Sequence, residues 1–117
     1  MVIIYGNKDL WQSFPPDVAS KAIAEVDDFN KRHIVSAELS AAYGLGDEVT
    51  AKTVRVRDGV PAVTDGPYLE AKEFVSSVFI LDCENEARTL EIAAEYPFAA
   101  HSAVDVWPIL HEAGQEM

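Results

Sequence analysis

The chain is poor in cysteine and lacks long apolar segments. Cys83 is the single cysteine among 117 residues, so no disulfide can form within the chain, and a lone cysteine suits a reducing compartment. No apolar run approaches the roughly 20 residues that a membrane-spanning helix needs. The start, Met1-Val2-Ile3-Ile4-Tyr5, has no basic segment and is too short for a secretory signal. We therefore expect a cytoplasmic protein without a membrane segment.

Positive charge is also scarce. Nine Lys and Arg residues stand against 20 Asp and Glu residues, which gives a formal net charge of −11. The basic residues are scattered along the chain, whereas nucleic-acid binding depends on Lys and Arg side chains that neutralise phosphates. The composition therefore predicts neither nucleic-acid binding nor binding to an anionic membrane, and the charge favours solubility.

Several motifs that identify cofactor sites are missing. The three histidines and Cys83 lie in unrelated segments, so no metal site is recognisable. There is no phosphate-binding loop, dinucleotide fingerprint or nucleophile elbow. We expect no metal and no cofactor.

The length of 117 residues fits one domain, 1–117, whose first half alternates strands with a helix. Residues 2–5 read as an apolar strand and residues 6–9 as a turn. Pro15-Pro16-Asp17 is typical of a helix start, and we expect this helix to run to about Arg32. Residues 35–41 alternate between apolar and polar side chains, as a strand does. The buried stripe of the helix is predicted to contain Val18, Ala22, Val26 and Phe29.

A β-hairpin is predicted within residues 50–64. Thr53-Val54-Arg55-Val56-Arg57 alternates and meets Asp58-Gly59, a strong two-residue turn signal. Pairing across this turn sets Val56 opposite Pro61 and Val54 opposite Val63. Arg55 and Arg57 then share the other face, where we expect them to meet acidic groups of the protein. Pro61 cannot donate to a strand ladder, so its strand should lie at an edge.

The second half repeats the strand–helix–strand pattern. Except for Ser76-Ser77, residues 74–81 are apolar on both faces, which favours a central strand. A helix is expected over residues 86–96, ending before Pro97, and a last strand over 103–109. Residues 111–117 read as a frayed tail. The predicted buried stripe of this helix is Ala87, Leu90 and Ala94, with Glu91 and Glu95 in water.

These elements predict an α+β protein. With the hairpin treated as an insertion, the order is βαββαβ, the ferredoxin-like arrangement, in which both helices cover one face of an antiparallel sheet. The other face would be bare and carry apolar residues. Because such a face usually finds a partner, we expect a homodimer with two sheets packed face to face.

The segment 65–73, Asp65-Gly66-Pro67-Tyr68-Leu69-Glu70-Ala71-Lys72-Glu73, concentrates charge beside a turn. Asp65-Gly66-Pro67 suits a backbone turn, and Asp65 can alternatively serve as a ligand-binding or acid–base group. The charges of Glu70, Lys72 and Glu73 fit a solvated loop. In the functional alternative, a carboxylate moves a proton of a bound compound and Lys72 stabilises the anion that forms.

His101 is the best candidate for a general base, because an imidazole exchanges protons near neutral pH. Asp105 follows four residues later, roughly 13 Å away along a strand, too far for contact. A carboxylate partner would then come from segment 65–73. The structural alternative is a histidine that caps a helix–strand connection. His33 and His111 are expected at the surface.

Three aromatic residues, Tyr5, Tyr68 and Trp107, can line a ligand pocket, with core or dimer packing as the alternative. The full set of candidate ligand-binding residues is Tyr5, Gly66, Pro67, Tyr68, Glu73 and Trp107.

Four segments, which with their spacing span nearly the whole chain, resemble the YCII-related family and its branch named for an Asp-Gly-Pro-Phe motif. They are Val2-Ile3-Ile4-Tyr5-Gly6, Thr53-Val54-Arg55-Val56-Arg57-Asp58-Gly59, Val63-Thr64 with the segment 65–73, and Pro97-Phe98-Ala99-Ala100-His101 with Val104-Asp105-Val106. The third segment is the specific one. The resemblance implies a ferredoxin-like subunit that pairs into a dimeric α/β barrel with an active-site cleft near the motif.

The resemblance also implies candidate activities. Related YCII proteins have been viewed as small-molecule enzymes with a His-Asp dyad, and one branch removes halide from a chlorinated hydroxyquinol. Members of the Asp-Gly-Pro branch often accompany extracytoplasmic-function sigma factors in bacteria.

The chain departs from the family pattern at four places. The histidine of the dyad belongs in the first helix, where this chain has Lys21-Ala22-Ile23-Ala24, so the dyad cannot be carried over. Tyr68 replaces the motif's phenylalanine. Ser76-Ser77 replaces a usual Gly-Gly pair, and Trp107 replaces a usual arginine, which removes a group that would hold an anionic ligand.

Two classes of function remain open. One is a cofactor-free enzyme that performs proton transfer, isomerisation or elimination on a hydroxylated or cyclic organic compound. In it His101 acts as base, Asp65 and Glu70 orient or donate protons, and Lys72 stabilises charge. The other is a non-catalytic ligand-sensing or regulatory module that acts with a sigma factor. A closed polar cleft favours the enzyme, and a convex loop favours recognition.

Overall fold

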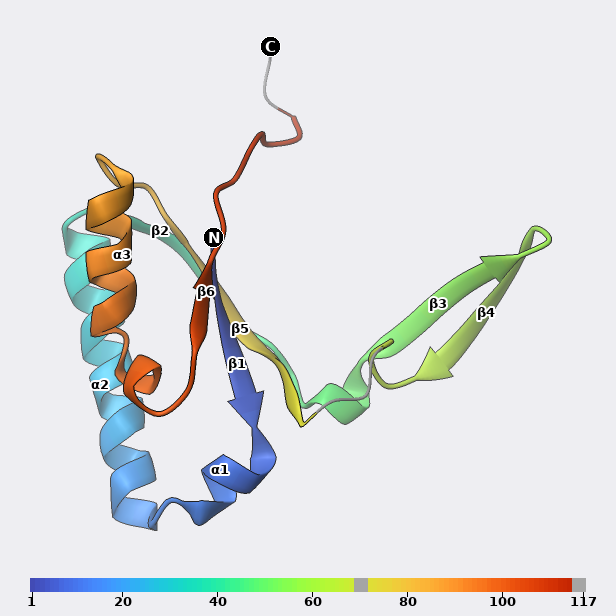
Figure 1. Ribbon diagram of the computed structural model, residues 1–117, viewed down its shortest axis with the longest axis horizontal. Helices are drawn as coiled ribbons and strands as arrows, with labels where there is room; N and C mark the ends of the chain where they lie inside the picture. Colours follow the sequence, from blue (N-terminus) through green and yellow to red (C-terminus); the bar gives the residue numbers. More distant parts are fainter. Residues whose placement is uncertain (69–71, 115–117) are drawn as a thin grey trace.

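The computed structural model describes residues 1–68 and 72–114. Four strands form an antiparallel sheet in the order β2-β5-β1-β6, and two more form a separate hairpin (Figure 1). The sheet contains β1 (Val2–Asn7), β2 (Leu39–Gly44), β5 (Glu73–Leu81) and β6 (Val104–Val106). The helices are α1 (Lys8–Ser13), α2 (Pro16–Val35) and α3 (Glu86–Glu95), with the short 3₁₀ turns η1 (Glu48–Thr50) and η2 (Pro97–Ala100). Without α1 and the hairpin, the order confirms the predicted ferredoxin-like α+β fold, and β5 is central as expected.

The helices α2 and α3 lie together on one face of the sheet (Figure 1). The core between the layers is small and aromatic: Phe29 of α2 packs edge-on against Phe79 of β5 at 5.6 Å and against Tyr96 at 5.2 Å. Phe29 and Ile92 are fully buried there with Val2. Within the described residues, no helix is both long and apolar enough to cross a membrane.

The structure corrects three element boundaries. Helix α2 continues to Val35, so the strand expected from residue 35 begins only at Leu39, after a turn in which Ala37 has φ 64°. The expected turn over residues 6–9 is instead the end of β1 and the start of α1. The Asn7 side chain accepts a hydrogen bond from the Leu10 amide and caps this helix. Strand β6 is shorter than predicted.

The predicted buried stripe of α3 is wrong. Ala87, Leu90 and Ala94 are exposed, whereas Ile92 and Ala93 are buried. Ile92 and Ala93 precede the buried Tyr96 by four and three residues, the same helical spacing as in the predicted set, so the pattern alone did not select one. On α2, Ala22 and Phe29 are buried as predicted, but Val18 is exposed.

The opposite face of the sheet is uncovered in the chain. Directly paired residues of antiparallel strands lie on the same face, and the pairs Ile3–Val78, Tyr5–Val75 and Tyr43–Val78 share the face opposite Val2 and Phe79. Tyr43 and Val75 are exposed, while Ile3, Tyr5 and Val78 are half-buried. The bare apolar face expected from the pattern is therefore present.

The hairpin of β3 (Lys52–Arg57) and β4 (Val60–Asp65) projects from the body, on the side of the sheet away from the helices (Figure 1). Its register confirms the prediction: Val54 pairs with Val63, Val56 with Pro61, Arg55 with Ala62 and Arg57 with Val60. Asp58 and Gly59 have φ values of 51° and 76°, as a two-residue turn of this type requires.

Candidate functional site

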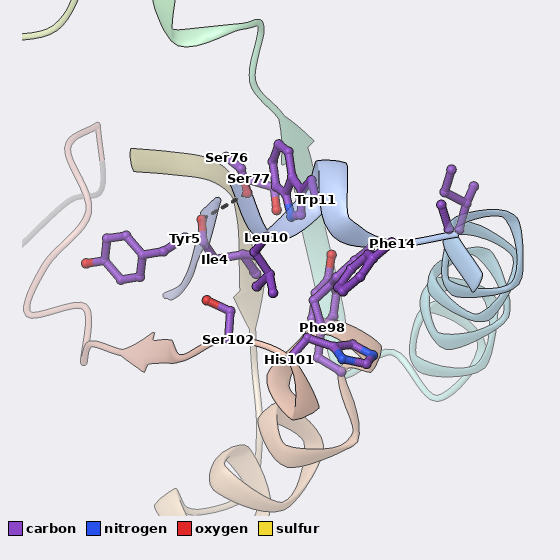
Figure 2. Close-up of a pocket in the computed structure, with 13 residues that line it drawn as sticks. Ile4, Tyr5, Leu10, Trp11, Phe14, Ser76, Ser77, Phe98, His101 and Ser102 are labelled. Carbon is purple, nitrogen blue, oxygen red and sulfur yellow. Dashed lines mark hydrogen bonds between the residues drawn. The ribbon is translucent and has the colours of Figure 1, made fainter. Parts of the chain in front are cut away.

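A cavity of about 380 Å³ lies between α1, the first turns of α2, η2 and the sheet (Figure 2). Its walls are mainly apolar and include aromatic rings that come from β1, α1 and η2 or from residues next to these elements. We call it the aromatic cavity. Its apolar wall includes Ile4, Leu10, Trp11, Phe14 and Phe98.

Local sequence explains how this wall forms. Gly6 of β1 leaves room for Trp11: a Cβ at residue 6 would lie 2.5 Å from Cη2 of the indole. The Trp11 ring also packs edge-on against Phe74, with centroids 5.7 Å apart. Because Asn7 caps α1 directly after β1, the helix turns its aromatic residue back onto the end of the strand.

His101 is the titratable group that best fits a chemical role in the aromatic cavity. It follows η2, and its ring packs against Phe14 with centroids 5.0 Å apart and lies 6.4 Å from Phe98. The residue itself is exposed, so the imidazole lies between the cavity and solvent. No Asp or Glu lines this cavity among the described residues, so His101 does not have the carboxylate partner expected from segment 65–73.

Hydroxyl groups supply the other polar contacts of the aromatic cavity. Ser102 lies beside His101, and Ser76 and Ser77 line the sheet side (Figure 2). The Ser76 hydroxyl donates to the Ile4 carbonyl at 3.2 Å. Burial raises the pKa of Tyr96, and a hydrogen bond with the Ser77 side chain acts in the opposite direction. Ser76 and Ser77 occupy the two positions where the family resemblance predicted glycines.

The motif segment lies at the base of the hairpin, away from His101. The exposed Asp65 carboxylate pairs with Lys52 across the hairpin. Gly66 has φ 86°, a value that favours glycine, and its amide donates to the Ala51 carbonyl at 2.7 Å. The Thr53 hydroxyl donates to the Gly66 carbonyl at 2.8 Å. These contacts support the turn-forming interpretation of the motif; Glu70 lies outside the described residues.

A second cavity, of about 660 Å³, adjoins the motif on the uncovered face of the sheet. We call it the motif cavity. It brings together four of the predicted ligand-binding residues, but Lys72 lines a smaller pocket beside Asn7 and Lys8 instead. The predicted residues in the motif cavity are Tyr5, Pro67, Tyr68 and Glu73.

Tyr5 and Trp107 occupy different environments. The Tyr5 hydroxyl donates to the Asp105 carboxylate at 2.8 Å, and this hydrogen bond, with desolvation and the negative charge, raises the pKa of Tyr5. Trp107 lines a third cavity, of about 390 Å³, between α3 and the segment after β6. The three aromatic residues therefore do not form one pocket: Tyr5 and Tyr68 line the motif cavity, and Trp107 lines the third cavity. The Tyr68 ring also packs under the Arg55 guanidinium at 5.5 Å.

One polar pair was missed by the sequence interpretation. His33 was expected at the surface but is 4% exposed, and its Nε2 atom lies 2.9 Å from a Glu95 carboxylate oxygen. Its ring packs against Phe29 with centroids 4.6 Å apart. The helical pattern contained a signal, because His33 follows Phe29 by four residues and so extends the buried stripe of α2. His111 is exposed, as predicted.

In the ranges 1–68 and 72–114, no group of three or more His, Cys, Asp or Glu side chains is placed so that it could hold a metal ion. What the site offers is an apolar cavity with an imidazole and hydroxyl groups at its rim. Such a site can hold a small organic molecule and exchange a proton with it.

Comparisons with known proteins agree with the fold. The model of the YCII-related domain matches residues 18–112. An uncharacterized protein of Rhizobium meliloti (strain 1021) is 20% identical over 94 residues, which cover 80% of this chain and 76% of that protein. The Asp-Gly-Pro-Phe branch stays a prediction. The antiparallel sheet, the paired helices and this match together show that the chain belongs to the YCII-related family.

Proposed function

We propose that the aromatic cavity binds a small, mainly apolar organic compound that carries a hydroxyl or another exchangeable proton. The proposal rests on the meeting of five aromatic side chains with the His101 imidazole around a cavity of about 380 Å³, a size typical of ligand pockets. The rings supply apolar contact area, and His101 and Ser102 supply hydrogen bonds that orient the compound.

The chemistry that this site supports is cofactor-free proton transfer. In isomerisation, His101 takes the proton from a bound hydroxyl or carbon acid and returns it to another atom of the same compound. In elimination, His101 takes a proton from carbon and passes it to solvent, the C–H electron pair forms a double bond, and a leaving group such as halide or hydroxide departs from the adjacent carbon with its own bonding pair. The serine hydroxyls can donate to the oxyanion that forms. Roles for Asp65, Glu70 and Lys72 in this chemistry stay predictions. The geometry favours His101 over Asp65 and Lys72, because these two residues lie at other sites.

Binding can be measured through Trp11. The chain has two tryptophans, so Trp107→Phe leaves Trp11 as the single reporter inside the cavity wall. Titration with phenols and cyclic enols should change the fluorescence of this variant and raise its melting temperature. His101→Ala should weaken binding by roughly tenfold, the value of one hydrogen bond to the ligand. His111→Ala is the matched control, because it removes an exposed tail imidazole.

The outcomes separate the two classes of function. Binding with conversion of the compound, detected by NMR and abolished in His101→Ala, supports the enzyme. Binding without conversion supports the ligand-sensing module. If phenols and cyclic enols leave Trp11 fluorescence and the melting temperature unchanged, the proposed site is wrong.

We further propose that the uncovered sheet face packs against the same face of a second copy. Tyr43 and Val75 are exposed on it, and apolar faces of this kind usually find a partner. Sedimentation analysis across a range of protein concentrations tests this dimer, and a monomer at all concentrations would contradict it.

A further inference from the structure

The β3–β4 hairpin, Lys52–Asp65, is an arm with one apolar face. Val54 and Val63 form one directly paired set on that face, and Val56 and Pro61 form the next. Their exposure is high: Val54 is 64%, Val56 65% and Val63 62% exposed. A two-stranded hairpin is at best marginally stable by itself in water. An arm that leaves its apolar face in water therefore needs a surface to cover it.

The arm also differs in charge from the rest of the chain. It carries three of the nine basic residues, Lys52, Arg55 and Arg57, but only two of the 20 acidic residues. Lys52 pairs with Asp65 at its base. Across residues 1–68 and 72–114, neither Arg55 nor Arg57 forms an ion pair, although both were expected to meet acidic groups. The arm is thus a slightly basic segment on a strongly acidic protein.

The direction of the arm identifies the surface that it can reach. The arm projects on the side of the sheet that the helices leave uncovered, away from its own body (Figure 1). A second copy seated on that face would lie beside the arm. This second copy also carries excess negative charge, which complements Arg55 and Arg57.

We propose that the arm docks on a second copy of this chain, with the face of Val54, Val56, Pro61 and Val63 against the partner. Two-fold symmetry makes the contact reciprocal, so each dimer contains two docked arms. The arginines lie on the other face of the arm, and their long side chains can reach past its edge to acidic groups of the second copy. The inference rests on the dimer proposed above and adds the segment that holds it together.

Serine substitutions on opposite faces of the arm provide a matched test. Val54→Ser with Val63→Ser removes two valines from the apolar face. Val60→Ser with Ala62→Ser changes the arginine face, where Val60 is equally exposed at 65%. We expect the first pair to weaken dimerisation roughly hundredfold or more, because four valine side chains are lost per dimer. The second pair should change the dimer dissociation constant by less than about threefold.

Sedimentation equilibrium measures the dissociation constants, and circular dichroism checks that each variant keeps its fold. If neither pair of serine substitutions changes the dissociation constant of the dimer, the proposed docking of the arm is wrong, whereas the dimer itself still stands. A wild-type chain that is monomeric at all concentrations would overturn both proposals. If the arginine-face pair weakens the dimer as much as the valine-face pair, the assignment of the docking face is wrong.

Discussion

At the scale of single residues, His33 is a buried polar residue that pairs with Glu95 between α2 and α3. The imidazole is 4% exposed and is held between the Phe29 ring and the Glu95 carboxylate. Its loss removes a hydrogen bond and leaves a cavity in the core between α2 and α3. His33 therefore contributes both packing, through its ring, and a hydrogen bond, through Nε2.

We expect His33→Ala to lower the free energy of unfolding by about 2–4 kcal/mol. His111→Ala, at an exposed position, should change it by less than about 0.5 kcal/mol. Urea unfolding monitored by circular dichroism gives both values. Equal stabilities of the two variants would show that the His33 contact contributes little.

Tyr5 and Asp105 provide a prediction at alkaline pH. The hydrogen bond to Asp105 raises the pKa of Tyr5 in the folded state above its ordinary value of about 10. The folded state then holds the phenol proton more tightly than the unfolded state, so stability is lost as pH rises above about 10. Asp105→Asn should bring the pKa of Tyr5 back toward its ordinary value and reduce this loss.

Absorbance titration of tyrosine ionisation and urea unfolding at pH 8 and above pH 10 measure the effect of Asp105→Asn. Asp82→Asn removes the same charge from an exposed position and serves as control. A phenol titration that Asp105→Asn leaves unchanged would contradict the assignment.

At the scale of elements, α1 depends on one glycine of β1. A Cβ at Gly6 would approach two atoms of the Trp11 ring at 2.5 and 2.7 Å and Phe74 at 2.9 Å. Gly6→Ala should therefore displace Trp11, destabilise the fold by about 1–3 kcal/mol and open the aromatic cavity to water. In the Trp107→Phe background, Trp11 emission should shift to longer wavelength.

Gly44→Ala is the control for this prediction, because no atom lies within 4 Å of a Cβ at that position. It should leave the Trp11 emission unchanged. An unshifted spectrum in Gly6→Ala would show that α1 adjusts without moving the ring.

Helix α3 is tied to the start of β2 by Arg88. Its guanidinium donates to both Glu38 oxygens, at 2.9 and 3.0 Å, and these hydrogen bonds lower the pKa of Glu38. A lowered pKa means that this stabilisation is present above the ordinary value of about 4.3 and is lost as pH falls through the folded-state value. Arg88→Lys cannot form the bidentate contact, so the midpoint of acid unfolding should move to higher pH.

Arg32→Lys provides the comparison, since Arg32 pairs with Asp28 on the exposed surface of α2. Its acid midpoint should stay at the wild-type value. If both variants unfold at the same pH, the Glu38 contact does not control acid stability.

At the scale of the whole molecule, the arm and the body should differ in local stability. A two-stranded arm has few contacts to protect its amides, whereas β1 and β5 are the inner strands of a sheet that helices cover on one face. If the arm docks on a second copy, its amide exchange should slow as protein concentration rises. Hydrogen exchange with mass spectrometry measures this, and arm exchange independent of concentration would contradict docking.

Prediction from the sequence succeeded where local rules act. The hairpin register follows from a two-residue turn and strict alternation, and both are properties of about ten neighbouring residues. The α3 stripe failed because apolar residues lie on more than one side of the helix, and the side that is buried depends on packing against residues of other elements such as Phe29 and Phe79. The candidate site was predicted only in part. The motif turn is local and was predicted, whereas the surroundings of His101 come from α1, η2 and the sheet and were not.

Local sequence patterns were enough to predict the four strands of the sheet, the two long helices, the ferredoxin-like class and the hairpin, because periodicity and turn chemistry operate between neighbours. Helix α1 was not predicted. The tertiary structure alone decided which distant groups meet. It paired His33 with Glu95 across 62 residues and Tyr5 with Asp105 across 100. It also placed His101 in the aromatic cavity and the motif turn at the base of the arm, because packing of helices on a sheet selects one arrangement among many with the same pattern.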